Sequence, residues 1–509
     1  MNKRRRTNSD KMLPNVCRRE LGELSPRSFK LQQSASEDVV QRFEIYKKLE
    51  KHRGCVNTVS FNYDGDILIS GSDDRRVILW DWATGKSKLS FYSGHVSNIF
   101  HAKFMPYTDD RSIVTCAADG QVRYSQILES GEVKISLLAK HEGGAHKLAI
   151  EPGSPHVFYS CGEDGLVQHF DLRTETATEL FSCRLTQERR RYTPIIHLNA
   201  IAIDPRDPNL FSVAGSDEYA RLYDIRMYQS DGTPNSGQPV NYFCPSHLIG
   251  DRVGITGLAY SDNSELLASY NDESIYLFTH DMGLGPNPCQ QFSKSLRKGK
   301  KGQTSSLFSG LADKPTPQVY KGHRNCETVK GVGFFGPKSE YVVSGSDCGR
   351  IFIWKKGGEL IRIMEADKDI VNCIEAHPHT PVLASSGIED DIKIWTPTAA
   401  ERAVLPRRID GVKPKPRPWS HHISTPEEVL MQLFSSLHRA SGAESEHDTD
   451  SPTVMSSTGL DLMELMFSYN GMEDSSDSSD AGGDGDENGE LSEEAGGEGD
   501  ASGPEDFFN

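Results

Sequence analysis

The sequence has no pair of cysteines at C-x-x-C spacing, although ten cysteines are scattered along its 509 residues. That scatter fits neither a zinc site nor a disulfide framework, and it is typical of proteins from a reducing compartment. No apolar run approaches the roughly 18 residues that a membrane-spanning helix needs. The basic N-terminus also has no apolar stretch of the kind that makes a signal peptide. We therefore expect a protein of the nucleus and cytoplasm.

Signatures of the common enzyme classes are missing as well. The sequence contains no G-x-x-x-x-G-K-[ST] phosphate loop, no H-E-x-x-H zinc motif and no G-x-S-x-G nucleophile elbow. No dinucleotide-binding fingerprint follows a predicted strand. His421 and His422 are adjacent, but no further ligands lie at metal-binding spacing. We predict that the chain is not an enzyme and holds neither a cofactor nor a metal ion.

Positive charge is absent from the end of the chain. Residues 472–509 contain fourteen Asp and Glu residues and no Lys or Arg, whereas the formal net charge of the whole chain is -17. The rest of the chain is therefore close to neutral. Because a segment with so little apolar surface cannot form a core, we predict a disordered acidic tail over residues 443–509.

The sequence is rich in one internal repeat. The segment ILISGSDDRRVILWDW (67–82) recurs as YVVSGSDCGRIFIWKK (341–356) and as VLASSGIEDDIKIWTP (382–397), with four weaker copies in between. Each copy is predicted to form a strand, a tight turn and a second strand that ends in an aromatic residue. The seven aromatic residues are Trp80, Tyr124, Phe170, Tyr223, Phe278, Trp354 and Trp395.

The spacing of the copies predicts the fold. Most follow one another at 41 to 55 residues and one pair at 76, against the roughly 40–45 residues of a WD40 blade. Polar insertions at 227–250 and 281–318 account for the longer intervals. The repeat predicts an all-β fold, a seven-bladed WD40 β-propeller over residues 44–400, with disordered or partly helical extensions at both ends.

Resemblance to the WD40 family adds expectations for single residues. It implies a hydrogen-bonded network within a blade, which joins a His ahead of the repeat to a strand Ser, a turn Asp and the final Trp. In the first blade the members are His52, Ser70, Asp74 and Trp80. In the sixth blade they are His323, Ser344 and Trp354, and Cys348 stands where the acid belongs, so that network is incomplete. The resemblance also suggests that EIYKKL (44–49) closes the last blade.

Three basic stretches lie outside the repeats: KRRR (3–6), RRRY (189–192) and QFSKSLRKGKKG (291–302). The first is equally typical of a nuclear import signal and of a solvated tail. The third has one aromatic residue for base stacking, which favours a solubilising loop over a contact with RNA or an acidic protein. We therefore expect neither a membrane nor nucleic acid as a partner.

Residues 401–442 are predicted to form a Pro- and Arg-rich linker and then an amphipathic helix. The helix begins with the cap Thr425 and Pro426, and Gly442 ends it. Its apolar face fits packing against the propeller or binding in a partner's groove. A second apolar island, LDLMELMFSYNGM (460–472), fits either a recognition helix or a loosely docked tail.

Two consecutive repeats end alike, in FDLR (170–173) and YDIR (223–226). In each ending an Arg stands two residues after an Asp. In neighbouring blades both guanidinium groups would emerge at the same rim of the propeller. Each would offer a planar set of donors to carboxylate or carbonyl acceptors.

Paired endings of this kind resemble the W-D-x-R motifs of WD40 proteins that serve as substrate receptors of cullin-4 RING ubiquitin ligases. The resemblance implies that Arg173 and Arg226, supported by Asp171 and Asp224, dock on the adaptor called damaged-DNA-binding protein one. Phe170 and Tyr223 replace the Trp of that motif. Residues 24–62, together with GSDDRRVILWDW (71–82), resemble the subgroup called DDB- and cullin-4-associated factor eight.

Members of this family often carry a helical segment ahead of the propeller that inserts into the adaptor. Within the extension 1–43, residues 15–43 are the candidate: Ser36 is a helix cap and is followed by the apolar residues Val39, Val40 and Phe43. The resemblance thus predicts a substrate receptor that recruits an unidentified protein for ubiquitination. The alternative is a general WD40 scaffold in a chromatin or ribonucleoprotein assembly, with the acidic tail contacting basic partners.

Overall fold

The computed structural model describes residues 12–174, 176–185, 194–228, 237–286, 288 and 315–405. The three basic stretches, the predicted helix within 401–442, the apolar island 460–472 and the acidic tail lie outside these residues. The described residues all belong to the first of two compact units, Met1–Pro414, and the second unit is Lys415–Asn509. No helix among the described residues is long and apolar enough to cross a membrane.

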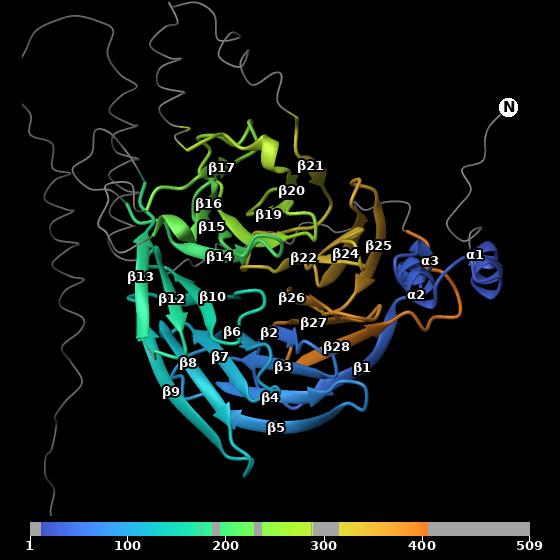
Figure 1. The fold of residues 1–509 in the computed structure, drawn as a ribbon, viewed down its shortest axis with the longest axis horizontal. Coiled ribbons are helices and arrows are strands. Elements are labelled where there is room, and N and C mark those ends of the chain that lie inside the picture. The colour runs from blue at the N-terminus through green and yellow to red at the C-terminus, as the bar shows by residue number, and fades with distance from the viewer. Residues whose placement is uncertain are drawn as a thin grey trace, which may run out of the picture. The chain divides into compact units, whose positions relative to one another are not determined.

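Seven four-stranded antiparallel sheets form the blades of a β-propeller, as the repeat predicted (Figure 1). Blades 1 to 3 consist of β2 (Val56–Phe61), β3 (Ile67–Ser72), β4 (Arg76–Asp81) and β5 (Lys86–Tyr92); β6 (Ile99–Phe104), β7 (Ser112–Ala117), β8 (Gln121–Ile127) and β9 (Val133–Lys140); and β10 (Ala145–Ile150), β11 (Val157–Gly162), β12 (Leu166–Asp171) and β13 (Thr176–Ser182). Blades 4 and 5 consist of β14 (Leu198–Ile203), β15 (Leu210–Gly215), β16 (Ala220–Asp224) and β17 (Asn241–Phe243); and β18 (Ile255–Tyr260), β19 (Leu266–Tyr270), β20 (Ile275–Phe278) and β21 (Gln318–Tyr320). Blades 6 and 7 consist of β22 (Val332–Phe335), β23 (Tyr341–Ser344), β24 (Arg350–Lys355) and β25 (Leu360–Glu365); and β26 (Val371–Ala376), β27 (Leu383–Gly387), β28 (Asp391–Thr396) and β1 (Glu44–Glu50).

Burial follows the position of each strand within its blade. In blade 1, five of the six residues of β3 are buried, whereas none of β5 is, because neighbouring sheets cover both faces of an inner strand. The innermost strands of all seven blades line one central channel of about 740 Å³.

The predicted closing strand is confirmed. β1 pairs antiparallel with β28, from Glu44 opposite Thr396 to Glu50 opposite Asp391. Blade 7 therefore combines three strands from the end of the propeller with one from its start. This pairing leaves no open sheet edge at the point where the ring closes.

The order of the strands gives the propeller two distinct faces. In blades 1, 2, 3 and 6 the turns between the first and second strands and between the third and fourth strands lie at one end, the bottom face. In blades 4, 5 and 7 the turn between the first and second strands lies at that same end. The turns between the second and third strands, and the connections from blade to blade, lie at the other end, the top face. This division follows from antiparallel pairing alone.

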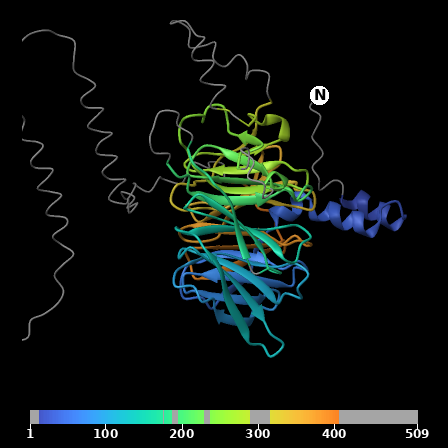
Figure 2. The ribbon, with the colours of Figure 1, turned by 60° about the vertical axis from the view of Figure 1, so that its left-hand side comes forward.

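Three helices precede the propeller: α1 (Met12–Glu20), α2 (Pro26–Ser34) and α3 (Glu37–Gln41). Within the described residues, the single-turn 3-10 helices η2 (Ile225–Met227) and η3 (His280–Met282) follow the third strands of blades 4 and 5. α3 contacts β25, and Figure 2 shows α1 and α2 projecting from the side of the propeller.

Candidate functional site

The two Asp-x-Arg endings adopt the same local structure. Arg173 and Arg226 follow the ends of β12 and β16, and each guanidinium folds back onto the Asp of its own strand. In both cases Nε donates to Oδ1 at 2.9 Å, Nη2 donates to Oδ2 at 2.6 Å, and the backbone N–H of the Arg donates to Oδ1 at 3.0 Å. The Asp therefore caps the turn and holds the guanidinium in a two-bond fork.

The electrostatics of these pairs produce a fixed, ionised arginine. Hydrogen bonds from the Arg173 side chain lower the pKa of Asp171 to about 2, and those from Arg226 shift the pKa of Asp224 downward. The two arginine side chains remain 65% and 60% exposed, so their other N–H groups can reach a partner. Fixing the guanidinium in advance reduces the side-chain entropy lost on binding.

Both pairs lie on the bottom face of neighbouring blades. Asp171 and Asp224 end the third strands of blades 3 and 4, and antiparallel pairing sends both strand ends to that face. The structure thus brings together the four residues that the sequence analysis singled out.

The replacement of Trp in these motifs affects the interior of the blades. Phe170 and Tyr223 are 1% and 2% exposed. Phe170 stacks on Phe158 at 4.5 Å between ring centroids, and the Tyr223 hydroxyl lies 3.4 Å from Cys183 Sγ. These rings fill the core, while the Asp and Arg that follow them keep the same geometry in both blades. The departure from Trp therefore changes core packing and leaves the exposed Asp–Arg pair intact.

Of the three apolar residues predicted to bind the adaptor, two are part of the core of the protein. Val40 and Phe43 are fully buried in a cluster with residues of blades 6 and 7, and Phe43 packs edge-on against Phe335 at 5.5 Å between ring centroids. Val39 is half-buried. In this structure, Val40 and Phe43 anchor α3 to its own propeller and present no surface to a partner.

Local contacts hold α3 in place. The predicted cap is confirmed, because Ser36 Oγ accepts a hydrogen bond from the backbone N–H of Val39 at 3.4 Å. The Tyr341 hydroxyl donates to the Ala35 carbonyl at 2.8 Å, and Arg362 Nη2 donates to the Phe43 carbonyl at 2.9 Å.

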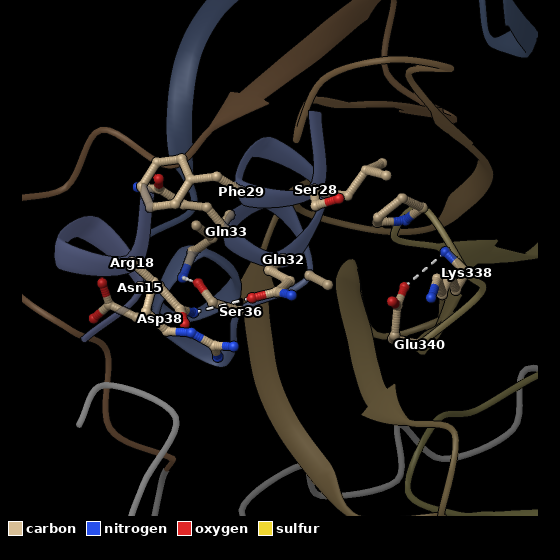
Figure 3. A pocket seen from close by; sticks show the side chains of 14 residues that line it. Asn15, Arg18, Ser28, Phe29, Gln32, Gln33, Ser36, Asp38, Lys338 and Glu340 are labelled. Carbon is tan, nitrogen blue, oxygen red and sulfur yellow. Dashed lines mark hydrogen bonds between the residues drawn. The ribbon is translucent and has the colours of Figure 1, made fainter. Parts of the chain in front are cut away.

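The exposed part of the extension is the pair α1 and α2, whose separate helices the sequence analysis did not resolve. The signal was present, because Ser25 caps α2 by accepting the N–H of Ser28 at 3.1 Å, and Pro26 occupies the first turn. Between the helices and the turn from β22 to β23 lies a hollow of about 650 Å³, and Figure 3 shows Phe29 and Arg18 at its helical side and Lys338 and Glu340 at its propeller side.

The polar network expected in blade 1 is confirmed. His52 Nδ1 lies 2.9 Å from Asp74 Oδ2, His52 Nε2 lies 2.8 Å from Ser70 Oγ, and Trp80 Nε1 donates to the same Oγ at 2.8 Å. Blades 2 and 3 contain His–Asp–hydroxyl networks that the sequence analysis did not map. Their members are His95, Asp119 and Thr115, and His141, Asp164 and Ser160.

Blade 6 lacks this network, as the missing acid predicted. Trp354 Nε1 donates to the Lys321 carbonyl at 3.0 Å instead of to Ser344, and neither ring nitrogen of the buried His323 has a hydrogen-bond partner in the described part of the chain. A fully buried ion pair between Lys330 and Asp347 takes its place.

Two clusters of metal-ligating side chains occur among the described residues, and a lysine serves each of them. Asp367, Glu389 and Asp391 all form ion pairs with the buried Lys393 ammonium. Asp347, which groups with Cys326 and Glu327, pairs with Lys330. The ammonium groups supply the positive charge that a cation would bring to these carboxylates.

Comparison with known proteins agrees with the fold. The sequence model described as "WD domain, G-beta repeat" matches residues 43–81, 315–355 and 358–396, which lie in blades 1, 5, 6 and 7 and the closing strand.

Several curated proteins are similar to this chain. The chain is 36% identical over 277 residues to "DDB1- and CUL4-associated factor 6" of Mus musculus, a match that covers 52% of this chain and 31% of the relative. It is 33% identical over 302 residues to "Protein ALTERED SEED GERMINATION 2" of Arabidopsis thaliana, covering 53% of this chain and 39% of that protein. It is 22% identical over 621 residues to "WD and tetratricopeptide repeats protein 1" of Mus musculus, covering 78% of this chain and 91% of the relative.

The matches to the first two proteins thus span less than half of those relatives' length, and about half of this chain. The seven four-stranded sheets, the confirmed closing strand and the match to the WD-repeat model lead to one conclusion: the chain is a seven-bladed β-propeller with WD40 repeats.

Proposed function

We propose that this protein is a substrate receptor of a cullin-4 RING ubiquitin ligase and does no chemistry of its own. The observation that carries the proposal is the pair of identically locked arginines, Arg173 and Arg226, on the bottom face of adjacent blades. Similarity to a protein whose name states an association with DDB1 and CUL4 supports the same reading. The resemblance of residues 24–82 to factor eight supports placement in that subgroup.

In this proposal the adaptor, damaged-DNA-binding protein one, docks on the bottom face. The two guanidinium groups offer preformed donors to its carboxylates or backbone carbonyls. The exposed helices α1 and α2 provide a second contact, and the exposed Leu21 and Leu31 supply apolar surface there. The top face stays free to recruit a protein for ubiquitination. The nucleus and cytoplasm are the proposed compartments.

The test is a titration of purified full-length chain with the purified adaptor by biolayer interferometry. The Arg173→Ala, Arg226→Ala double variant is expected to weaken binding at least about tenfold, which corresponds to roughly 1.4 kcal/mol. Arg111→Ala is the matched control, because Arg111 lies next to β7 on the same face, is 48% exposed and pairs with Glu129. Circular dichroism checks that each variant is folded.

Three outcomes separate the alternatives. Loss of binding in the double variant alone supports the arginine site. Equal binding by wild type and double variant contradicts that site and moves docking to α1 and α2. No binding by the wild type contradicts the ligase-receptor function and favours the general scaffold.

A further inference from the structure

The top face of blade 1 carries a concentration of positive charge that the adaptor contact does not use. A hollow of about 430 Å³ is lined by Lys51, Arg53, Asp74, Arg75, Arg76, Ser90 and Tyr92. These residues come from the connection between β1 and β2, the turn between β3 and β4, and the end of β5. Arg53, Arg75 and Tyr92 are exposed, so a ligand can reach the hollow from solvent.

The charge of the hollow is not neutralised from within. Its one acidic side chain, Asp74, is occupied by His52 at 2.9 Å and by the backbone N–H groups of Arg53 at 3.1 Å and Arg76 at 2.9 Å. Within the described part of the chain, neither Arg53 nor Arg75 forms an ion pair with an acidic side chain. Two guanidinium groups therefore face solvent with unused donors.

Blade 6 shows what a neutralised version of this site looks like. Arg350 begins β24 as Arg76 begins β4, and its cross-strand neighbour is Glu365, with which it forms an ion pair at 3.4 Å. In blade 1 the neighbour of Arg76 is Tyr92, whose ring lies 4.1 Å from the guanidinium carbon. An aromatic ring in place of a carboxylate orients the arginine without cancelling its charge.

The backbone at Arg75 is a second unusual feature. Arg75 has a φ of 63°, and at the same place in blades 2, 3 and 6 the left-handed residue is Gly120, Gly165 or Gly349. A residue with a Cβ in this conformation costs about 1 kcal/mol relative to glycine. Among the seven turns between second and third strands, that of blade 1 is the only one with a basic residue. The chain thus keeps an arginine at a position that three sister blades fill with glycine.

We propose that Arg53, Arg75 and Arg76, with Tyr92, bind the phosphate of a phosphorylated serine or threonine in a partner peptide. A phosphate dianion matches several guanidinium forks, which bind it through paired hydrogen bonds. The tyrosine hydroxyl is already under the influence of these groups. The hydrogen bond and charge of Arg76, with smaller contributions from Arg75 and Arg53, lower its pKa.

The surroundings favour a single phosphorylated side chain over a nucleic acid. The corresponding turns of blades 2 to 7 each contain at least one Asp or Glu, among them Asp119, Glu163, Asp272 and Glu389. A duplex laid across the top face would meet these acids. A phosphorylated residue at the rim of blade 1 meets Lys51 and three arginines against one carboxylate, Asp74, which is already hydrogen-bonded.

The hollow lies on the face opposite the Asp–Arg pairs. The identification of the phosphopeptide as part of a ligase substrate rests on the proposed function, whereas its binding to the hollow does not.

The test is fluorescence anisotropy on the full-length chain with a degenerate peptide pool that carries a central phosphothreonine. The same pool with threonine, the same pool with glutamate and a labelled DNA duplex are measured beside it. We expect the phosphothreonine pool to bind at least about tenfold more tightly than either of the other pools. Arg75→Gly and Arg53→Ala are expected to remove that preference.

Arg75→Gly is the decisive variant, because glycine relieves the backbone strain and should leave the unfolding midpoint unchanged or raise it. Its loss of binding cannot then be attributed to misfolding. Arg350→Ala, the paired arginine of blade 6, is the matched control and should bind as the wild type does.

Equal binding of the three pools, or unchanged binding by Arg75→Gly, overturns the proposal. Equal affinity for the glutamate pool overturns it in favour of an acidic segment. If the DNA duplex displaces the phosphothreonine pool, and Arg75→Gly loses binding of both ligands, the proposal is overturned in favour of a nucleic-acid site. Adaptor binding measured on the same variants keeps the two proposals apart, because Arg75→Gly should retain the adaptor and the Arg173→Ala, Arg226→Ala variant should retain the phosphopeptide.

Discussion

The hydrogen-bonded network of blade 1 allows a prediction with a control inside the same chain. Ser70 and Ser385 stand ten residues before Trp80 and Trp395, and both serines are fully buried. Ser70 Oγ hydrogen-bonds to Trp80 Nε1 and His52 Nε2, each at 2.8 Å. Ser385 Oγ accepts from Trp395 Nε1 at 2.9 Å and contacts no histidine within the described part of the chain. Replacing each serine with alanine removes the same atom from the same position of two blades.

The difference between the two variants isolates the histidine contact. Each buried polar group left without a partner costs about 1–3 kcal/mol. Ser70→Ala leaves two buried groups without a hydrogen-bond partner, Trp80 Nε1 and His52 Nε2, whereas Ser385→Ala leaves only Trp395 Nε1. Ser70→Ala should therefore lower the free energy of unfolding by about 1–3 kcal/mol more than Ser385→Ala does. Changes in volume and strand propensity are the same in both and cancel in the comparison.

Equilibrium urea unfolding of the full-length chain, followed by far-ultraviolet circular dichroism, measures both costs. The slope of the free energy of unfolding against urea concentration must be the same in both variants and the wild type, because only then does a shift in the midpoint report a change in stability. Trp80→Phe removes the indole N–H donor together with part of the aromatic ring system. It should cost less in the Ser70→Ala background than in the wild type, because the hydrogen bond to Ser70 is already absent there. An equal or larger cost for Ser385→Ala would refute the reasoning, because the His52 contact would then contribute nothing.

Two further predictions concern blade 6, which lacks this network. Lys330→Met should lower the free energy of unfolding by about 3–5 kcal/mol, because it leaves the fully buried Asp347 carboxylate without its cation, and adding Asp347→Asn should recover most of the loss. Urea midpoints of the two single variants and the double variant test this, and a cost below about 1 kcal/mol for Lys330→Met would contradict it. Burial lowers the pKa of His323 to about 4 from its ordinary value of 6.5, so the unfolded chain takes up a proton there before the folded chain does. Its contribution to stability is intact above pH 6.5 and falls by up to about 3 kcal/mol as the pH drops toward 4. His323→Leu should flatten the acid side of the stability profile, and parallel profiles for variant and wild type would exclude this role.

Features that depend on residues close together in the chain were predictable. The number of blades follows from the repeat, because each copy contains its own strands, turn and closing aromatic residue. The Asp–Arg fork was also within reach, since Asp171 and Arg173 stand two residues apart on one turn and their contact needs no distant partner. The cap at Ser36 belongs to the same class.

The role of buried charge was not predictable in the same way. Charged residues are ordinarily expected at the surface. Lys330 lies in the interior because Asp347, seventeen residues away, approaches it from a turn. Lys393 pairs with its near neighbours Glu389 and Asp391 and also with Asp367, more than twenty residues away. A sequence pattern records the charges but not which of them will meet.

The sequence by itself determined the seven blades and the face on which the paired arginines emerge, because these follow from local strand and turn preferences repeated along the chain. The closing strand was expected from resemblance to the WD40 family, since β1 and its partner β28 lie at opposite ends of the propeller sequence. The tertiary structure alone decided that Val40 and Phe43 cover blade 6. There they pack in one buried cluster with Phe335 and Tyr341, which lie nearly 300 residues further along the chain. It also decided that Arg53, Arg75 and Tyr92 line one hollow, since three separate segments of the chain deliver them. The physical reason is that apolar burial and charge pairing depend on what the folded chain brings within contact, and neither depends on separation along the sequence.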